Sequence, residues 1–140
     1  MTVPMEYRRA SADFDAFLAE AAEAAGLTTR HQSYTMVEGV LLAFRRRLTL
    51  AEAIAFAQEL PAMLRAMFVA DWDPDAPRVE SWDAASVLAD VQGLREHHNF
   101  APEGSVAAVA SVLRRHVDRA RFEAALVRLP APARAFWATA

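Results

Sequence analysis

The sequence predicts an all-α protein, a compact helical bundle of two tandem pseudo-symmetric units with three or four helices each. Apolar residues recur at the three- and four-residue spacing that places them on one face of a helix. Alanine, the best helix former, is abundant, and the second half of the chain repeats the pattern of the first. At 140 residues we expect a single domain. Its parts are one unit at about 11–70, a linker at 71–81 and a second unit at about 82–138.

The first predicted helix runs from a cap at Ser11 to Gly26. A serine side chain accepts a hydrogen bond from a backbone N–H of the first turn. Glycine readily adopts the left-handed conformation that ends many helices. The buried stripe of this helix is expected to contain Phe14, Phe17, Leu18, Ala21 and Ala25.

A second helix is expected to begin near Tyr34 or Met36, because Thr35 and Glu38 have the spacing of a capping box. Gly39 lies inside this helix, where glycine costs about 1 kcal/mol relative to alanine. We expect a close crossing with another helix to be the reason for it.

Two short helices are predicted next. Thr49 and Glu52 form another capping box, which predicts a third helix through about Glu59. Its core-facing residues are expected to be Ala53, Ile54, Ala57 and Leu60. Pro61 cannot continue that helix but is favoured in the first turn of a new one, so a short fourth helix should follow it. The prolines and aspartates of residues 71–81 then predict a linker.

The helical pattern restarts after the linker. Ser81 is expected to cap a helix that continues through Val91 and ends at Gly93. The remaining helices are expected from Pro102 to Val117, after Asp118, and after Pro130.

This restart is an internal repeat. A shift of 69 residues aligns 33–68 with 102–137 without a gap, and 11 of the 36 aligned positions are identical. Arg45-Arg46 aligns with Arg114-Arg115, and Leu60-Pro61-Ala62 aligns with Leu129-Pro130-Ala131. Alanine-rich helices resemble one another by composition, but composition does not explain shared landmarks at one constant spacing. Two units are too few for a solenoid array, so we expect them to pack together around one core.

The same landmarks resemble those of a bacterial family, the domain-of-unknown-function 2267 family. Its members combine a long helix ending in an arginine-rich turn, an acidic alanine-rich helix, a Leu-Pro step and a Trp-Asp-Pro segment. Here these features stand at 40–48, 50–60, Leu60-Pro61 and 72–74, within a resemblance from about Phe14 to Trp137. One departure is Asp71, where the family often has glycine. The resemblance implies a helical fold and a bacterial source, and it implies no activity.

Composition argues against several classes of function. The formal net charge is −3, whereas nucleic-acid binding depends mostly on neutralising phosphates, so we expect no nucleic-acid partner. The chain has no cysteine, which excludes disulfides and fits a reducing compartment. The longest apolar stretch, Val106–Leu113, is far short of the roughly 20 residues of a membrane span. Residues 1–9 lack a signal-peptide pattern. We expect a cytoplasmic protein.

No motif predicts a metal, a cofactor or a catalytic centre. The alternating Asp71, Asp73 and Asp75 resemble the start of a calcium loop, but Ala76 and Trp82 stand where that loop needs glycine and glutamate. The histidines at 31, 97, 98 and 116 lack the spacing of a zinc-binding helix. No nucleophile elbow or glycine-rich phosphate loop is present. We therefore expect a protein that is not an enzyme.

Arginine pairs are the first candidate site. Arg45, Arg46, Arg114 and Arg115 would form a paired site for an anion or a partner if the repeat brought them together, because guanidinium groups bind phosphate and carboxylate well. The alternative is structural, since cations at helix C-termini complement the helix dipole.

Apolar residues on the short helices are the second candidate site. Met63, Met67, Phe68 and Trp72 would form an interface if exposed, and otherwise belong to the core. The function expected from these features is a non-enzymatic interaction or adaptor domain that binds a protein partner or a second copy as a homodimer. The alternative is a domain that binds a small anion or another small molecule between the two units.

Overall fold

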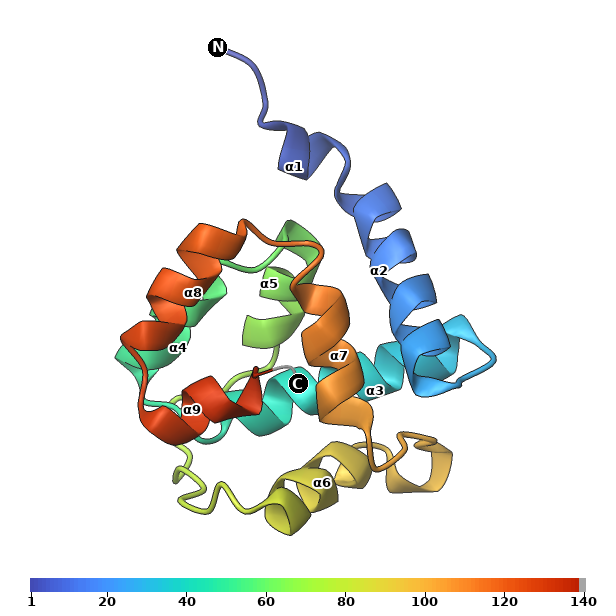
Figure 1. Cartoon of the computed structure of the whole chain (residues 1–140), viewed down its shortest axis with the longest axis vertical. Coiled ribbons are helices and arrows are strands. Elements are labelled where there is room, and N and C mark those ends of the chain that lie inside the picture. The colour runs from blue at the N-terminus through green and yellow to red at the C-terminus, as the bar shows by residue number, and fades with distance from the viewer. Residues whose placement is uncertain (139–140) are drawn as a thin grey trace.

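The computed structural model describes residues 1–138, and every regular element in that range is a helix. The protein is therefore all-α, as the sequence predicts (Figure 1). The first half contains α1 (Met5–Arg8), α2 (Ala10–Ala25), α3 (Arg30–Arg45), α4 (Leu50–Ala57) and α5 (Ala62–Val69). The second half contains α6 (Ala84–Gly93), the 3₁₀ turn η1 (Glu96–His98), α7 (Ser105–Leu113), α8 (Arg119–Val127) and α9 (Ala131–Phe136).

Local signals correctly predict several of the helix ends, but not the cap at Ser11, because α2 begins at Ala10 and its N-terminus has no side-chain cap. Gly26 ends α2 in the left-handed conformation, with φ of 71°. The capping box of Thr49 and Glu52 opens α4, and the Asp118 side chain caps α8. Pro61 precedes α5, and its counterpart Pro130 precedes α9.

The predicted start of α3 is wrong. The helix begins at Arg30, because Thr29 and Gln32 form the capping box instead of Thr35 and Glu38. The Thr29 hydroxyl accepts a hydrogen bond from the Gln32 backbone N–H at 3.1 Å, and the Gln32 side chain accepts one from the Thr29 N–H at 3.3 Å. This box adds more than a turn to the N-terminus of the helix.

The second half also departs from its predicted bounds. The helix α6 begins at Ala84 rather than next to Ser81. The helix α7 covers only Ser105–Leu113, because the Ser105 side chain and backbone both donate to the Pro102 carbonyl and fold that segment into a turn. The short elements α1 and η1 have no counterpart in the sequence-based prediction.

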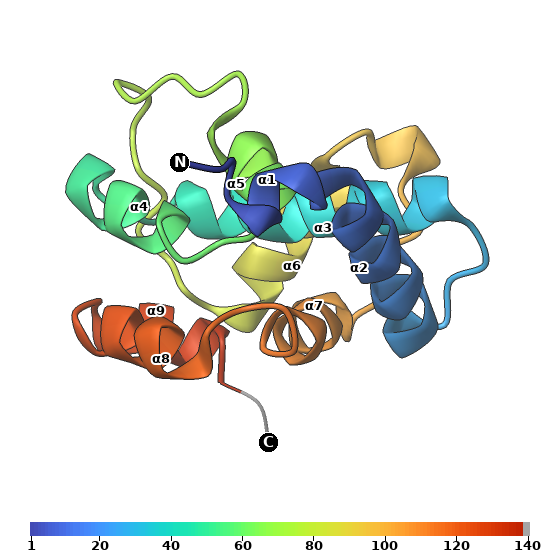
Figure 2. The same ribbon diagram turned by 90° about the horizontal axis from the view of Figure 1, so that it is seen from above.

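The helix α3 occupies the centre of the fold and packs against α2, α5, α6 and α7. Figure 2 shows α7, α8 and α9 together on one side of α3. The hydrophobic core takes buried residues from both halves. Its largest fully buried side chains include Trp137, Phe44, Phe56, Phe68 and Phe122.

Gly39 lies where α3 crosses α6, as the sequence predicts. A Cβ atom at this position would lie 2.7 Å from the Val91 carbonyl oxygen and 3.3 Å from a methyl group of the same valine. Contacts below 3.0 Å with backbone require the helices to move apart. The absence of a Cβ atom in Gly39 therefore allows the short distance between the two helices.

We expect Gly39→Ala to lower the free energy of unfolding by up to about 2 kcal/mol, because an overpacking cost of about 1–3 kcal/mol at the crossing outweighs the gain of roughly 1 kcal/mol in helix propensity. Urea unfolding followed by circular dichroism measures the change. Gly93→Ala is the matched control, because a Cβ at Gly93 meets no atom within 4 Å. Equal stability of the two variants would contradict the close crossing.

Candidate functional site

Arg45 stabilises the C-terminal end of α5. Its Nη1 donates hydrogen bonds to the carbonyls of Phe68 at 2.8 Å and Ala70 at 3.0 Å. Its guanidinium carbon lies 5.2 Å from the centre of the Trp72 ring. Burial lowers the pKa of the Arg45 guanidinium, and the nearby Asp71 carboxylate acts in the opposite direction. This cation is already engaged by carbonyls and an aromatic face of its own chain.

Asp71 follows α5 with φ of 49°, in the left-handed region. Glycine adopts this region at no steric cost, and aspartate tolerates it better than most residues. The glycine that the resembling family often carries at this position therefore fits the same turn.

Arg114 makes the corresponding contact 69 residues further along the chain. Its Nε and Nη2 donate to the Trp137 carbonyl at 3.1 Å and 2.8 Å. The guanidinium also forms an ion pair with Glu123 and lies 5.3 Å from the centre of the Phe122 ring. Arg114 thus holds the end of α9 as Arg45 holds the end of α5.

A second pair of arginines repeats this arrangement. Arg65 donates to the Leu60 carbonyl at 2.9 Å, and Arg134 donates to the Leu129 carbonyl at 2.7 Å. Both arginines, and both acceptors, are separated by the 69-residue shift that aligns the halves. These recurring bonds agree with the internal repeat, which stays a prediction.

Arg46 and the neighbouring Arg47 both bind Asp90 of α6. Their Nη1 atoms lie 2.7 Å and 2.8 Å from the two carboxylate oxygens of Asp90. Arg47 is only 3% exposed, and it also donates to the Ser81 carbonyl at 2.6 Å and to the Ser86 hydroxyl at 3.1 Å. This network joins α3, the linker and α6.

Arg115 binds a different partner from those of Arg45 and Arg46. Its Nη1 is 3.0 Å from one carboxylate oxygen of Glu20, and the other oxygen lies 2.9 Å from Nε2 of His116. This pairing joins the end of α7 to α2.

The two arginine pairs therefore have different surroundings. Arg45 and Arg46 line a groove of about 700 Å³ beside the linker, whereas Arg114 and Arg115 contact α8, the end of α9, and α2. Each of the four guanidinium groups has a partner within the chain. A shared anion site between the pairs stays a prediction.

The four predicted interface residues differ in exposure. Phe68 is fully buried and Met67 is 7% exposed, so both belong to the core. Met63 is 40% exposed, and Trp72 is half-buried against the core. Any surface built from this set therefore depends on Met63 and Trp72.

The outer face of α4 carries an apolar surface that the sequence-based prediction missed. Leu50 and Ile54 lie one turn apart and are each 51% exposed, and Ala51 and Ala55, the residues that follow each of them, are also exposed. We define these four residues as the α4 face. Ile54 was expected in the core, and that prediction is wrong because Phe56 is buried instead. Residues two positions apart in an α-helix point in directions about 200° apart. Because Phe56 points into the core, Ile54 points outward.

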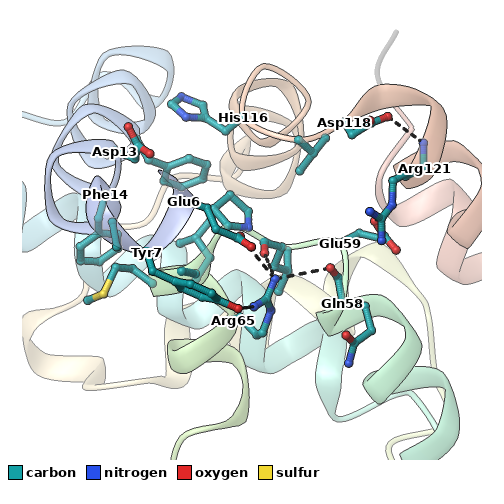
Figure 3. Close-up of a pocket in the computed structure, with 18 residues that line it drawn as sticks. Glu6, Tyr7, Asp13, Phe14, Gln58, Glu59, Arg65, His116, Asp118 and Arg121 are labelled. Carbon is teal, nitrogen blue, oxygen red and sulfur yellow. Dashed lines mark hydrogen bonds and ion pairs between the residues drawn. The ribbon is translucent and has the colours of Figure 1, made fainter. Parts of the chain in front are cut away.

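A pocket of about 410 Å³ lies between α1, α2, the start of α5 and the turn into α8 (Figure 3). Arg65 points into it, with Nη1 3.5 Å from the Tyr7 hydroxyl and Nη2 3.8 Å from Glu6. Across the pocket, Nε of Arg121 lies 3.2 Å from Glu59. Its cations and carboxylates largely neutralise one another, so the pocket does not concentrate charge of one sign.

Residues 1–138 contain neither a cluster of metal ligands nor a membrane-spanning helix. In this range no three histidine or acidic side chains gather as a metal site would require. His31 lies in the first turn of α3, and His97 and His98 lie in η1, so the histidines belong to different elements. None of the helices described has the length and hydrophobicity to cross a bilayer.

The fold and these contacts define an all-α protein whose buried and half-buried arginines bind its own helix ends and carboxylates. A family model for uncharacterized conserved proteins, DUF2267, matches residues 14–136. The chain therefore belongs to this family, which confirms the family resemblance that the sequence predicts. No curated protein matches the chain significantly.

We expect Arg47→Met to lower the free energy of unfolding by about 1–3 kcal/mol, because Asp90 loses its buried partner and the carbonyls of Ala43 and Ser81 lose their side-chain donor. Arg46→Met is the matched control. Arg46 binds the same carboxylate, but its side chain is 51% exposed, so its loss should cost less than about 1 kcal/mol. Thermal and urea unfolding measure both. Similar effects of the two substitutions would show that burial does not set the strength of this network.

Proposed function

We propose that this protein is a non-enzymatic interaction domain and that it docks a partner protein through the α4 face. The observation that carries the proposal is the exposure of Leu50 and Ile54 one turn apart. When a partner covers large aliphatic side chains that were in contact with water, the free energy of the complex falls by about 25 cal/mol per Å² of buried apolar surface.

The equivalent helix of the second half supports this interpretation. The helix α8 begins 69 residues after α4, and its positions equivalent to Leu50 and Ile54 hold Arg119 and Glu123. The fold therefore accommodates charged residues on the outer face of such a helix. Packing within the chain does not require leucine and isoleucine on α4, so a contact outside the chain is the better explanation for them.

The α4 face is continuous with the groove beside the linker. Leu50 lines that groove together with Trp72, Pro74 and Pro77. An apolar helix face next to a groove suits a partner helix with apolar residues at three- and four-residue spacing. Trp72, a predicted interface residue, would then lie at the edge of the contact.

The alternative function, binding of a small anion between the arginine pairs, has less support. Arg45 and Arg114 donate to backbone carbonyls, and Arg46 and Arg115 pair with carboxylates. An anion would have to compete with these partners. Anion binding by these residues stays a prediction without a specific observation in its favour.

We also propose a cytoplasmic location in a bacterium. The lack of cysteine fits a reducing compartment, and the family resemblance in the sequence implies a bacterial source.

Site-specific photo-cross-linking tests the proposed function. A photoreactive phenylalanine analogue at position 54 should give a discrete adduct in cells that express the protein, because this residue would lie inside the interface. The same analogue at position 119 is the matched control, since the exposed Arg119 occupies on α8 the place that Leu50 has on α4. Leu50→Arg, which introduces the residue found at the α8 position, should remove the adduct at position 54.

Equal adducts at positions 54 and 119, or no adduct at either, would overturn the assignment of the α4 face. Circular dichroism of each variant should match that of the unmodified protein, because both positions are exposed.

A further inference from the structure

An apolar groove lies between α6, the start of α7, and α9. Its volume is about 490 Å³, within the range of roughly 300–1,000 Å³ that is common for binding pockets. Its walls include half-buried aromatic and aliphatic side chains, and exposed alanines lie at its mouth. The residues that define it best are Trp82, Leu88, Val106, Ala107, Ala135 and Phe136.

The N-terminal arm, residues 1–9, is a projecting segment with exposed apolar side chains, whereas the groove is an apolar hollow. Its helix α1 has no buried residue, although Met1, Val3, Met5 and Tyr7 are all exposed apolar side chains. Figure 1 shows the arm projecting beyond α2 at one end of the bundle. The arm lies before the first residue of the family match at position 14, so the family core does not include it.

The charges of the arm and the groove are complementary. Arg8 and Arg9 are exposed on the arm, and neither forms an ion pair with another residue of the range 1–138. Glu103 lines the groove, and Asp83 follows the groove residue Trp82 along the chain. Both acidic residues are exposed and lack an ion pair in the same range. Two basic residues behind an apolar segment thus complement one acidic residue that lines the apolar groove and a second that neighbours a groove residue in the sequence.

The arm and the groove lie on different sides of the molecule. In Figures 1 and 2 the N-terminal residues lie near the α2 and α5 side, away from the α6 and α9 elements that form the groove. In a second copy of the chain, Glu6 and Tyr7 contact Arg65 of that copy, and the apolar side chains of Val3 and Met5 are exposed. When two copies exchange arms, both grooves are filled and the assembly closes as a two-fold dimer.

We propose that the N-terminal arm of one copy occupies the groove between α6, α7 and α9 of a second copy. Val3 and Met5 enter the apolar groove, and Arg8 and Arg9 face Glu103 and Asp83. This contact is separate from the α4 face and does not depend on the function proposed for that face.

Light scattering of the full chain over a range of concentrations tests the proposal. The unaltered chain should form dimers. Val3→Glu with Met5→Glu should weaken the dimer by at least about tenfold in dissociation constant, because it places carboxylates in an apolar groove. Ala107→Glu, which changes an exposed groove residue on a helix, should weaken it similarly. Ala124→Glu on the outer face of α8 is the matched control and should have no effect.

Mixing the variants gives a sharper result. The Val3→Glu, Met5→Glu chain retains an intact groove, and the Ala107→Glu chain retains an intact arm. Neither should dimerise alone, but the mixture should form a heterodimer through one remaining arm-to-groove contact. Raising the salt concentration should weaken the unaltered dimer, because exposed charges contribute to it.

A chain that stays monomeric up to about 1 mM overturns the proposal. Dimers that persist in both variants but disappear in Leu50→Arg also overturn it, and they would assign self-association to the α4 face instead. A small apolar molecule retained in the purified groove, with dimerisation unaffected by the arm substitutions, would show that the occupant is a ligand and not the arm.

Discussion

The structure depends on a cluster of aromatic side chains to which both halves of the sequence contribute. Trp137 follows α9, yet its ring lies 5.3 Å from that of Phe44 in α3 and stacks 5.4 Å from that of Phe56 in α4. Phe122 of α8 completes the contact with Phe56 at 5.9 Å. Each such pair adds roughly 0.5–1.5 kcal/mol beyond simple burial. Because neither half can form this cluster alone, we infer that the two units fold as one domain.

The arginines are best understood in relation to this core. The helix ends that carry Phe68 and Trp137 leave backbone carbonyls without helical partners, and Arg45 and Arg114 supply the missing donors. Arg47 similarly joins the linker and α6 to α3. Residues that would be candidates for an anion site from sequence alone therefore act largely within the chain. The apolar surfaces that the core does not use, on α4 and in the groove beside α9, are where we place the function.

Local sequence signals predicted much of the fold, and contacts across the chain set the rest. Gly26, Thr49 and Asp118 act on backbone groups within a few residues, so their roles were evident from the sequence. The start of α3 could not be predicted from local signals, since Thr29 with Gln32 and Thr35 with Glu38 have the same capping-box spacing and offer similar hydrogen bonds. The pairing of Arg47 with Asp90 joins residues 43 apart, and no local pattern indicates it. The sequence-based prediction placed Ile54 in the core, but Phe56 occupies the core side of the same short helix.

Native-state hydrogen exchange tests the shared core most directly. Amides in the middle of α3 and of α7 belong to different halves, and both helices pack against the common core. A single cooperative domain predicts that the slowest amides of the two helices exchange with the same opening free energy, equal to the global stability. A substitution such as Phe56→Ala should lower both values equally. If α7 exchanged through a separate, less stable opening that Phe56→Ala left unchanged, the two halves would be independent and the account would be wrong.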